Sequence, residues 1–168
     1  MTTEYKKSIN GNIDVFDVAN YFIHLSLKNK VDDDGTVEGI THLKLQKILY
    51  FAQCAYLSLY NKPLFDDEIK AWQYGPVISS IYDKYKVQEN KILQKDKNFN
   101  ENTLDEDIKD FLDDIWNYFS KFSTTELVNI THMHAPWKNA YTGDKDSVIE
   151  NEVLRQYYKG IFKLEDCA

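Results

Sequence analysis

Arginine is almost absent from this chain, and positive charge is in the minority. Arg155 is the only arginine in 168 residues, and the formal net charge at pH 7 is -7. Proteins that hold a DNA or RNA backbone neutralise its phosphates with lysine and arginine, and arginine is the most common reader of guanine. The composition therefore argues against a nucleic-acid partner. An acidic surface suits a basic protein partner, because complementary fields speed and orient the encounter.

Cysteine and long apolar runs are also scarce. Cys54 falls in an apolar helical stripe and Cys167 lies next to the C-terminus, so the two are poorly placed for a disulfide or a metal cluster of recognised spacing. No run approaches the roughly 18 uninterrupted apolar residues of a membrane span, and residues 1–7 lead into no apolar signal-peptide segment. These absences predict a cytoplasmic protein that is neither secreted nor inserted in a membrane.

The recognised catalytic and cofactor motifs are missing as well. The chain has no nucleophile elbow, no phosphate-binding glycine loop, no dinucleotide fingerprint and no paired Cys-x-x-Cys, and it holds only six glycines. His132 and His134 are the one close histidine pair, but this spacing points them roughly 200° apart on a helix, whereas a helical metal pair needs a spacing of three or four. We therefore expect no enzyme, no cofactor and no metal. A remote alternative is an enzyme site assembled around His132 from residues distant in sequence.

What the chain does contain is enough apolar material for one globular domain. Hydrophobic residues make up 43% of the sequence and aromatic residues 14%, which is sufficient to offset the entropy lost on folding. The length fits one domain, no linker divides it, and no internal repeat is present. We expect a single domain over residues 1–168, with residues 1–11 as a flexible leader.

Helical spacing of apolar residues dominates the pattern. The strongest example begins at Thr41 and ends near Asn61, where apolar residues occupy most of the helix circumference, so this segment is expected to be the central core helix. Capping boxes at Thr103–Glu106 and Ser123–Glu126 predict the starts of two later helices. The other expected helices cover residues 15–23, residues 76–85 and a final segment from Asn151.

One short segment departs from the helical period. Over residues 68–74 the period changes to two, with Ile69 and Ala71 on one side and Lys70, Trp72 and Tyr74 on the other, which predicts a strand that Gly75-Pro76 then stops. Because a lone strand must pair, we expect a partner strand around residues 91–94. The predicted fold class is mainly α, a compact bundle of about five to six helices with a small two-stranded β-ribbon.

Four aromatic residues near this strand and near the histidine pair favour two interpretations. Trp72, Tyr74, Trp137 and Tyr141 fit a buried core, which is the commoner role for such residues. Tryptophan and tyrosine are also enriched at the centres of protein-binding surfaces. A third interpretation combines the two, with one edge of the cluster buried and the other presented to a partner.

Several segments of the chain resemble one known family. The matching segments are residues 15–22, 40–52 with its Leu-Lys-Leu-Gln-Lys helix, 71–77 with Trp-Gln-Tyr-Gly-Pro, and 131–137 with its terminal Pro-Trp. In this order and spacing they resemble the Panacea, or SocA-like, antitoxin domain, of the phage- or prophage-associated type. The resemblance covers nearly the whole chain, and its Leu-Lys-Leu-Gln-Lys and Trp-Gln-Tyr-Gly-Pro motifs in combination are fairly specific.

The resemblance implies a bacterial antitoxin, a compact helical domain that binds and neutralises a protein toxin encoded by an adjacent gene. One type of member acts instead as an adaptor that delivers its toxin to a Clp-type protease, which gives the alternative function and a second partner. A strand-to-helix turn exposes backbone amides and aromatic edges together, so it is a reasonable place for a protein contact. The candidate protein-binding residues are Lys44, Gln73, Tyr74, Gly75, Pro76, His132 and Trp137.

Overall fold

The computed structural model describes residues 13–28, 39–88 and 90–162. These residues form seven α-helices and a small antiparallel sheet, which confirms the mainly α class. The expected leader at residues 1–11 and Cys167 lie outside the described residues. The helices are α1 (Val15–Lys28), α2 (His42–Tyr60), α3 (Ser79–Tyr85), α4 (Glu106–Phe119), α5 (Thr124–Met133), α6 (Ala135–Ala140) and α7 (Asn151–Tyr158), and the strands are β1 (Ile69–Trp72), β2 (Gly75–Ile78) and β3 (Val148–Ile149).

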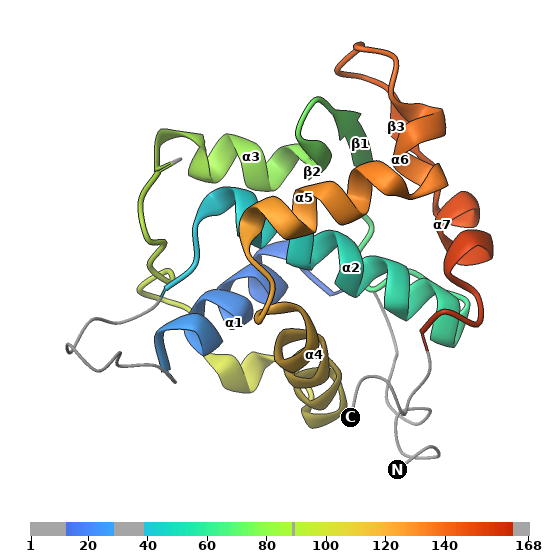
Figure 1. Cartoon of the computed structure of the whole chain (residues 1–168). Coiled ribbons are helices and arrows are strands. Elements are labelled where there is room, and N and C mark those ends of the chain that lie inside the picture. Colours follow the sequence, from blue (N-terminus) through green and yellow to red (C-terminus); the bar gives the residue numbers. More distant parts are fainter. Residues whose placement is uncertain (1–12, 29–38, 89, 163–168) are drawn as a thin grey trace.

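Helix α2 runs through the middle of the molecule. Helices α1 and α4 lie on one side of it, while α3, α5 and the sheet lie on the other (Figure 1). Every side chain from Leu45 to Leu57 is buried, including the polar residues Gln46, Lys47 and Gln53. The expectation of a central core helix is confirmed. A helix that is covered all round must also find a buried partner for each polar side chain that it carries.

The sheet differs from the expected ribbon. Strand β1 pairs with β2 directly across a tight turn, Trp72 facing Gly75 and Ile69 facing Ile78, and β3 pairs with its other edge. Gly75 and Pro76 therefore begin a strand instead of ending one, and the prediction of a partner at residues 91–94 was wrong. That segment contains no strand in the described structure. Leu93 is buried there and donates one backbone hydrogen bond to the carbonyl of Ile40, at 2.9 Å.

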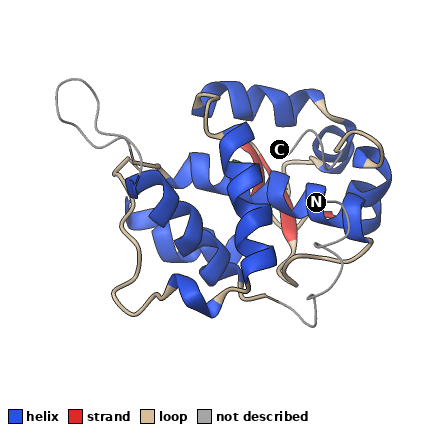
Figure 2. Cartoon of the chain, turned by 90° about the horizontal axis from the view of Figure 1, so that it is seen from below, coloured by secondary structure: helices blue, strands red, loops and turns tan. Residues whose placement is uncertain are grey.

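Figure 2 shows how small the sheet is beside the helices that surround it. The helix count also exceeds the expected five to six, because Ala135–Ala140 forms the additional short helix α6 directly after α5. Pro136 lies in the first turn of α6, where its missing N–H costs no hydrogen bond. His134 has an extended backbone and separates α5 from α6.

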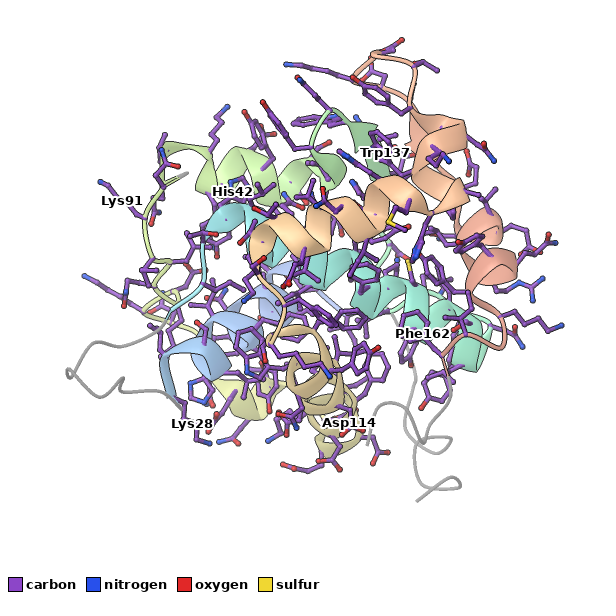
Figure 3. The ribbon with its side chains drawn as sticks, viewed as in Figure 1. Lys28, His42, Lys91, Asp114, Trp137 and Phe162 are labelled. Carbon is purple, nitrogen blue, oxygen red and sulfur yellow. The ribbon has the colours of Figure 1, made fainter. Side chains whose placement is uncertain are left out.

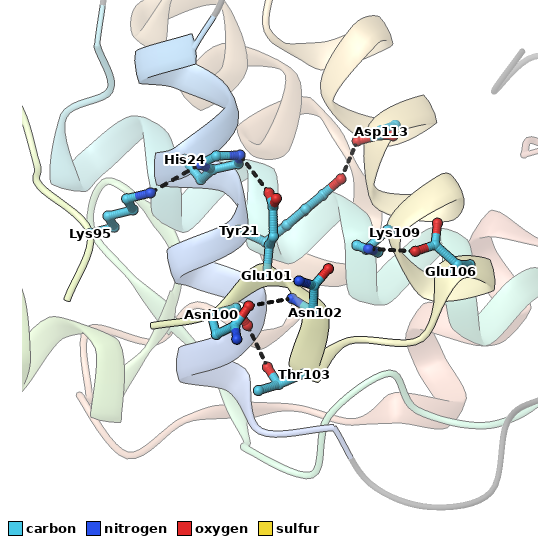
Figure 4. A network of polar contacts seen from close by, with 10 residues as sticks. All are labelled: Tyr21, His24, Lys95, Asn100, Glu101, Asn102, Thr103, Glu106, Lys109 and Asp113. Carbon is cyan, nitrogen blue, oxygen red and sulfur yellow. Dashed lines mark hydrogen bonds and ion pairs between the residues drawn. The ribbon is translucent and has the colours of Figure 1, made fainter. Parts of the chain in front are cut away.

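The two predicted capping boxes have different outcomes. At Ser123 the box is present: the side chain accepts from the Glu126 amide at 3.1 Å, and the Glu126 carboxylate accepts from the Ser123 amide at 2.6 Å. The box at Thr103 was wrong. Thr103 lies in a single 3-10 turn, and its hydroxyl donates to the carbonyl of Asn100 (Figure 4). The N-cap position of α4 is Asp105.

The segment that leads into α4 is held against α1 by polar contacts (Figure 4). Tyr21 donates to the Asp113 carboxylate at 2.7 Å, and Nε2 of His24 lies 2.7 Å from the Glu101 carboxylate. Burial, the largest effect, lowers the pKa of His24, against the pull of Glu101. Nζ of Lys95 lies 3.3 Å from Nδ1, so a neutral imidazole can accept a hydrogen bond from that ammonium group. This network belongs to the packing of α1 against α4.

Candidate functional site

The turn Gln73-Tyr74 joins β1 to β2. The next residue, Gly75, has no room for a side chain. Gly75 has a φ of +105°, a backbone conformation that favours glycine. A Cβ atom on Gly75 would lie 2.8 Å from Oγ1 of Thr131 and 2.9 Å from Cε of Lys47. Backbone conformation and space therefore both require glycine here. The requirement exists because β2 lies directly against α2 and α5.

Side chains of α2 cover the outer edge of β2. Nζ of Lys47 donates to the carbonyl of Pro76 at 2.9 Å. Gln46 donates to the carbonyl of Ile78 at 3.1 Å and accepts from the amide of Ile78 at 2.9 Å. Pro76 has no N–H, so it leaves no donor unpaired on this edge. The two α2 side chains thus replace the backbone of a neighbouring strand.

Lys47 is the least expected member of this arrangement because its side chain is fully buried. Burial lowers the pKa of Lys47 to about 7, since the dry interior disfavours the ammonium form. The positive field of Lys47 also contributes to the lowered pKa of His42, which burial, the larger effect, brings to about 4. Burial therefore makes the neutral amine of Lys47 accessible near pH 7, where an exposed lysine is almost entirely charged.

A column of stacked rings fixes the turn from the side of α5 and α6. His132 stacks on Trp137 with ring centroids 4.0 Å apart, and Trp137 stacks on Tyr141 at 4.8 Å. Nε1 of Trp137 donates to the carbonyl of Trp72 at 2.8 Å, which ties the column to the end of β1. Figure 3 shows Trp137 beside the sheet, at the opposite end of the molecule from Asp114.

His132 itself is placed for packing. Burial lowers the pKa of His132, a backbone hydrogen bond with Gln73 opposes that shift, and Lys47 adds to it. Lys47 is the one charged group that acts on the pKa of His132 in the part of the chain that the structure describes. The remote alternative of an enzyme site around His132 therefore gains no carboxylate partner. The described residues also include no cluster of three or more potential metal ligands.

In front of the turn lies a hollow of about 310 Å³. Its aromatic walls are Trp72, Tyr74, Tyr82 and Tyr141, and Lys145 lies at its rim. Tyr82 packs edge-on against Trp72 with centroids 4.8 Å apart, which fixes the plane of the indole. The remaining lining residues are His42, Leu43, Gln46, Ala71, Gln73, Val77, Gly143 and Asp144. The hollow thus combines aromatic walls with polar groups, as binding sites commonly do.

The turn presents one large side chain to solvent. Tyr74 is 62% exposed although its neighbours Gly75 and Pro76 are buried. Of the four aromatic residues singled out in the sequence, Trp72 and Trp137 are partly buried, and Tyr74 and Tyr141 are exposed. The mixed interpretation, with one edge buried and the other accessible, describes this cluster best.

The structure brings together six of the seven candidate binding residues. Gln73, Tyr74, Gly75 and Pro76 adjoin His132 and Trp137 through the contacts above. Lys44 is the exception, because its Nζ donates to the carbonyl of Ser120 at the end of α4, at 2.8 Å. Lys44 lies roughly one turn of α2 before Lys47. Its side chain therefore reaches the end of α4, whereas the side chain of Lys47 reaches β2.

Sequence reasoning missed Gln46 and Lys47 as parts of this site. The signal was present, because Gln46 and Gln53 are seven residues apart on a helix that is otherwise apolar around most of its circumference. Polar side chains on such a helix have to be buried and bonded. Gln53 confirms the rule by donating to the carbonyl of Phe65 at 2.8 Å and accepting from the amide of Leu64 at 2.7 Å.

A second, larger hollow of about 470 Å³ lies between α2, α5, α7 and the end of α4. Aromatic and aliphatic side chains dominate its lining, which includes Phe51, Tyr118, Phe122 and Phe162. Its polar members His134 and Tyr158 are bonded to each other at 2.8 Å. Few free polar groups remain there to orient a partner.

Comparisons with known proteins place these elements in context. A family model described as "Antitoxin SocA-like, Panacea domain" matches residues 45–138, a span that includes most of α2, the sheet turn, His132 and Trp137. The curated protein Antitoxin SocA of Caulobacter vibrioides (strain NA1000 / CB15N) is 29% identical over 111 residues, with 58% of this chain and 58% of that protein covered. No solved structure matches significantly. Among the described residues, no helix is both long and apolar enough to cross a membrane.

The crowding at Gly75 predicts a specific loss of stability. Gly75→Ala should destabilise the protein by about 1–3 kcal/mol more than Gly160→Ala in urea unfolding, because the new methyl must displace Lys47 and Thr131. Gly160 is the matched control: its φ is also positive, +81°, and a Cβ atom there would meet no other atom within 4 Å. Equal losses for the two variants would contradict the close approach of β2 to α2.

The buried amine of Lys47 predicts a pH dependence of stability. Its folded pKa of about 7 lies below the value of 10.5 for an exposed lysine, so the unfolded chain binds more protons between these values. The free energy of unfolding of the wild type, relative to Lys47→Met, should therefore rise with pH from about 7 to about 10.5, by up to ~1.4 kcal/mol per pH unit. Urea unfolding across this range measures it. A difference that stays flat would show that Lys47 is not buried as described.

Proposed function

The chain belongs to the SocA-like antitoxin family that carries the Panacea domain, and on this premise we propose that it acts as a single-domain antitoxin that neutralises a protein toxin by binding it directly. The cognate toxin is encoded by an adjacent gene in this proposal. Family membership carries the proposal, since the family model covers the helix and the turn that build the candidate site. The matched relative is named an antitoxin, and the chain spans 58% of its length.

The geometry of the turn supports a binding role. Tyr74 projects into solvent from a turn whose foundation, Gly75, Pro76 and Lys47, is buried and hydrogen-bonded. A tyrosine held in this way offers a large contact area and a hydroxyl while losing little conformational entropy on binding. We propose that the Gln73-Tyr74 turn and the hollow beside it form the toxin-binding surface.

Charge supports a basic toxin. The net charge of the chain is -7, and complementary charge raises association rates and disfavours wrong partners. A direct blocker of a toxin benefits from fast association, because each free toxin molecule does damage until it is captured. The proposed partner is therefore a protein with a positively charged binding face.

Co-expression tests both the function and the surface. Each neighbouring open reading frame is expressed alone and together with this protein. One of them should stop cell growth when expressed alone, and co-expression of the wild-type protein should restore growth. Tyr74→Ala should weaken binding to that toxin about tenfold or more, because truncation of a central interface tyrosine typically costs over 1 kcal/mol. Calorimetry measures the binding of a toxin variant that has lost its toxicity.

The matched control is Tyr118→Ala. Tyr118 is 42% exposed but lines the other hollow, so its loss should leave toxin affinity unchanged. Absence of any toxic neighbour that is rescued would overturn the proposed function. An affinity that falls for Tyr118→Ala but not for Tyr74→Ala would move the surface to the larger hollow. Toxin half-life in cells with and without Clp-type proteases separates blockade, which leaves the toxin intact, from delivery to a protease.

A further inference from the structure

The hollow beside the turn already holds one cation, and that cation belongs to the chain itself. Nζ of Lys145 lies 5.6 Å from the centroid of the Trp72 ring, within the range of a cation–π interaction, for which tryptophan is the best aromatic partner. Lys145 forms no ion pair within the described ranges 13–28, 39–88 and 90–162. The face of Trp72 is therefore the one described contact of this ammonium group.

The indole of Trp72 is held rigidly in the position that receives the cation. Its Nε1 donates to the backbone carbonyl of Lys145 at 2.9 Å, and Tyr82 packs edge-on against the ring. The backbone next to Lys145 is tied down as well, since the carbonyl of Ser147 accepts from the Ala71 amide at 2.8 Å. A ring fixed in this way loses no further freedom when a ligand arrives, which is the condition for an effective aromatic cation site.

The Lys145 side chain, in contrast, is exposed and can leave the ring at little cost. Its backbone is anchored, but its four-carbon stem is held only by the ring contact among the described residues. An exposed cation–π contact is worth about 0.5–1 kcal/mol, which an incoming cation with additional contacts exceeds easily. Asp144 lies beside Lys145 in the lining of the hollow, so displacement of the ammonium leaves an acidic rim.

We propose that this hollow is a recognition pocket for a positively charged side chain of the toxin, which stacks on Trp72 in place of Lys145. Tyr74 and Tyr141 border the same space and supply aromatic and hydroxyl contacts to the groups around that side chain. The inference rests on the proposed function for the identity of the partner. The pocket itself rests on the Trp72–Lys145 geometry and on the net negative charge of the chain.

Lys145 then acts as a competitor for the pocket. Lys145 and Tyr141 lie outside the residues that the family model matches, whereas Trp72 and Tyr74 lie inside. The residues that carry the competing cation are thus separate in sequence from the motif that contains Trp72 and Tyr74. Because Trp72 is held by the backbone carbonyl of Lys145, a change of the Lys145 side chain can adjust affinity for a basic partner without disturbing the turn.

A small probe tests the pocket without any toxin. Nα-acetyl-arginine amide is titrated into the full chain while the indole N–H resonance of Trp72, assigned with Trp72→Phe, is followed by NMR. We expect a saturable shift, and Nα-acetyl-citrulline amide, which has nearly the same shape but no charge, should produce none. In Lys145→Ala the arginine probe should bind about two- to fivefold tighter, because the internal cation no longer competes.

Lys121→Ala is the matched control. Nζ of Lys121 lies 4.5 Å from the centroid of the Tyr118 ring, so its loss removes a similar cation–π contact at a distance from the pocket. The probe should bind Lys121→Ala and the wild type equally. Equal responses to the arginine and citrulline probes, no response to either, or unchanged affinity in Lys145→Ala would each overturn the cation pocket.

A second arm joins the pocket to the proposed function. Binding of the inactive toxin to Lys145→Ala should be about two- to fivefold tighter than to the wild type, and Lys121→Ala should be unchanged. If the probe binds as expected but no neighbouring gene product is neutralised, the antitoxin proposal fails and the cation pocket stands. If a toxin is neutralised but Lys145→Ala changes neither its affinity nor that of the probe, the pocket fails and the antitoxin proposal stands.

Discussion

Between α2 and the sheet, the outer edge of β2 is buried, and each backbone polar atom there needs a partner, because an unpaired buried group costs about 1–3 kcal/mol. Gln46 and Lys47 supply those partners through the carbonyl of Pro76 and both backbone groups of Ile78. The close approach that makes these bonds also excludes a side chain at Gly75. The conformation of the turn therefore follows from how α2 satisfies one strand edge.

The exposed part of the site depends on this foundation. With β2 fixed against α2, and β1 fixed through the hydrogen bond from Trp137 to the carbonyl of Trp72, the two-residue connection has little freedom. Tyr74 projects from that connection, and Trp72 presents one face to the hollow. Residues that build the fold and residues that are free to meet a partner thus alternate within a few positions of the chain. This explains how a recognisable motif can be mostly scaffold and still carry the proposed binding surface.

The sequence predicted the parts of the structure that depend on local periodicity. The central helix, the box at Ser123 and the mainly α class could all be inferred, because apolar spacing and capping act over a few residues. The pairing of β1 was predicted wrongly, since the choice between residues 75–78 and 91–94 is made by the packing of β2 on α2. Lys44 was placed in the site for a similar reason: its true neighbour, Ser120, is 76 residues away. Burial of Lys47 follows from the same three-dimensional packing.

Hydrogen exchange of the complex with the cognate toxin tests the central claim most directly, because it maps the contact surface without altering either protein. Toxin binding should slow amide exchange in residues 71–76 and 141–147, which border the turn and its hollow, and should leave residues 118–122 unchanged. Slowed exchange confined to residues 118–122 and 158–162, around the larger hollow, would contradict that claim.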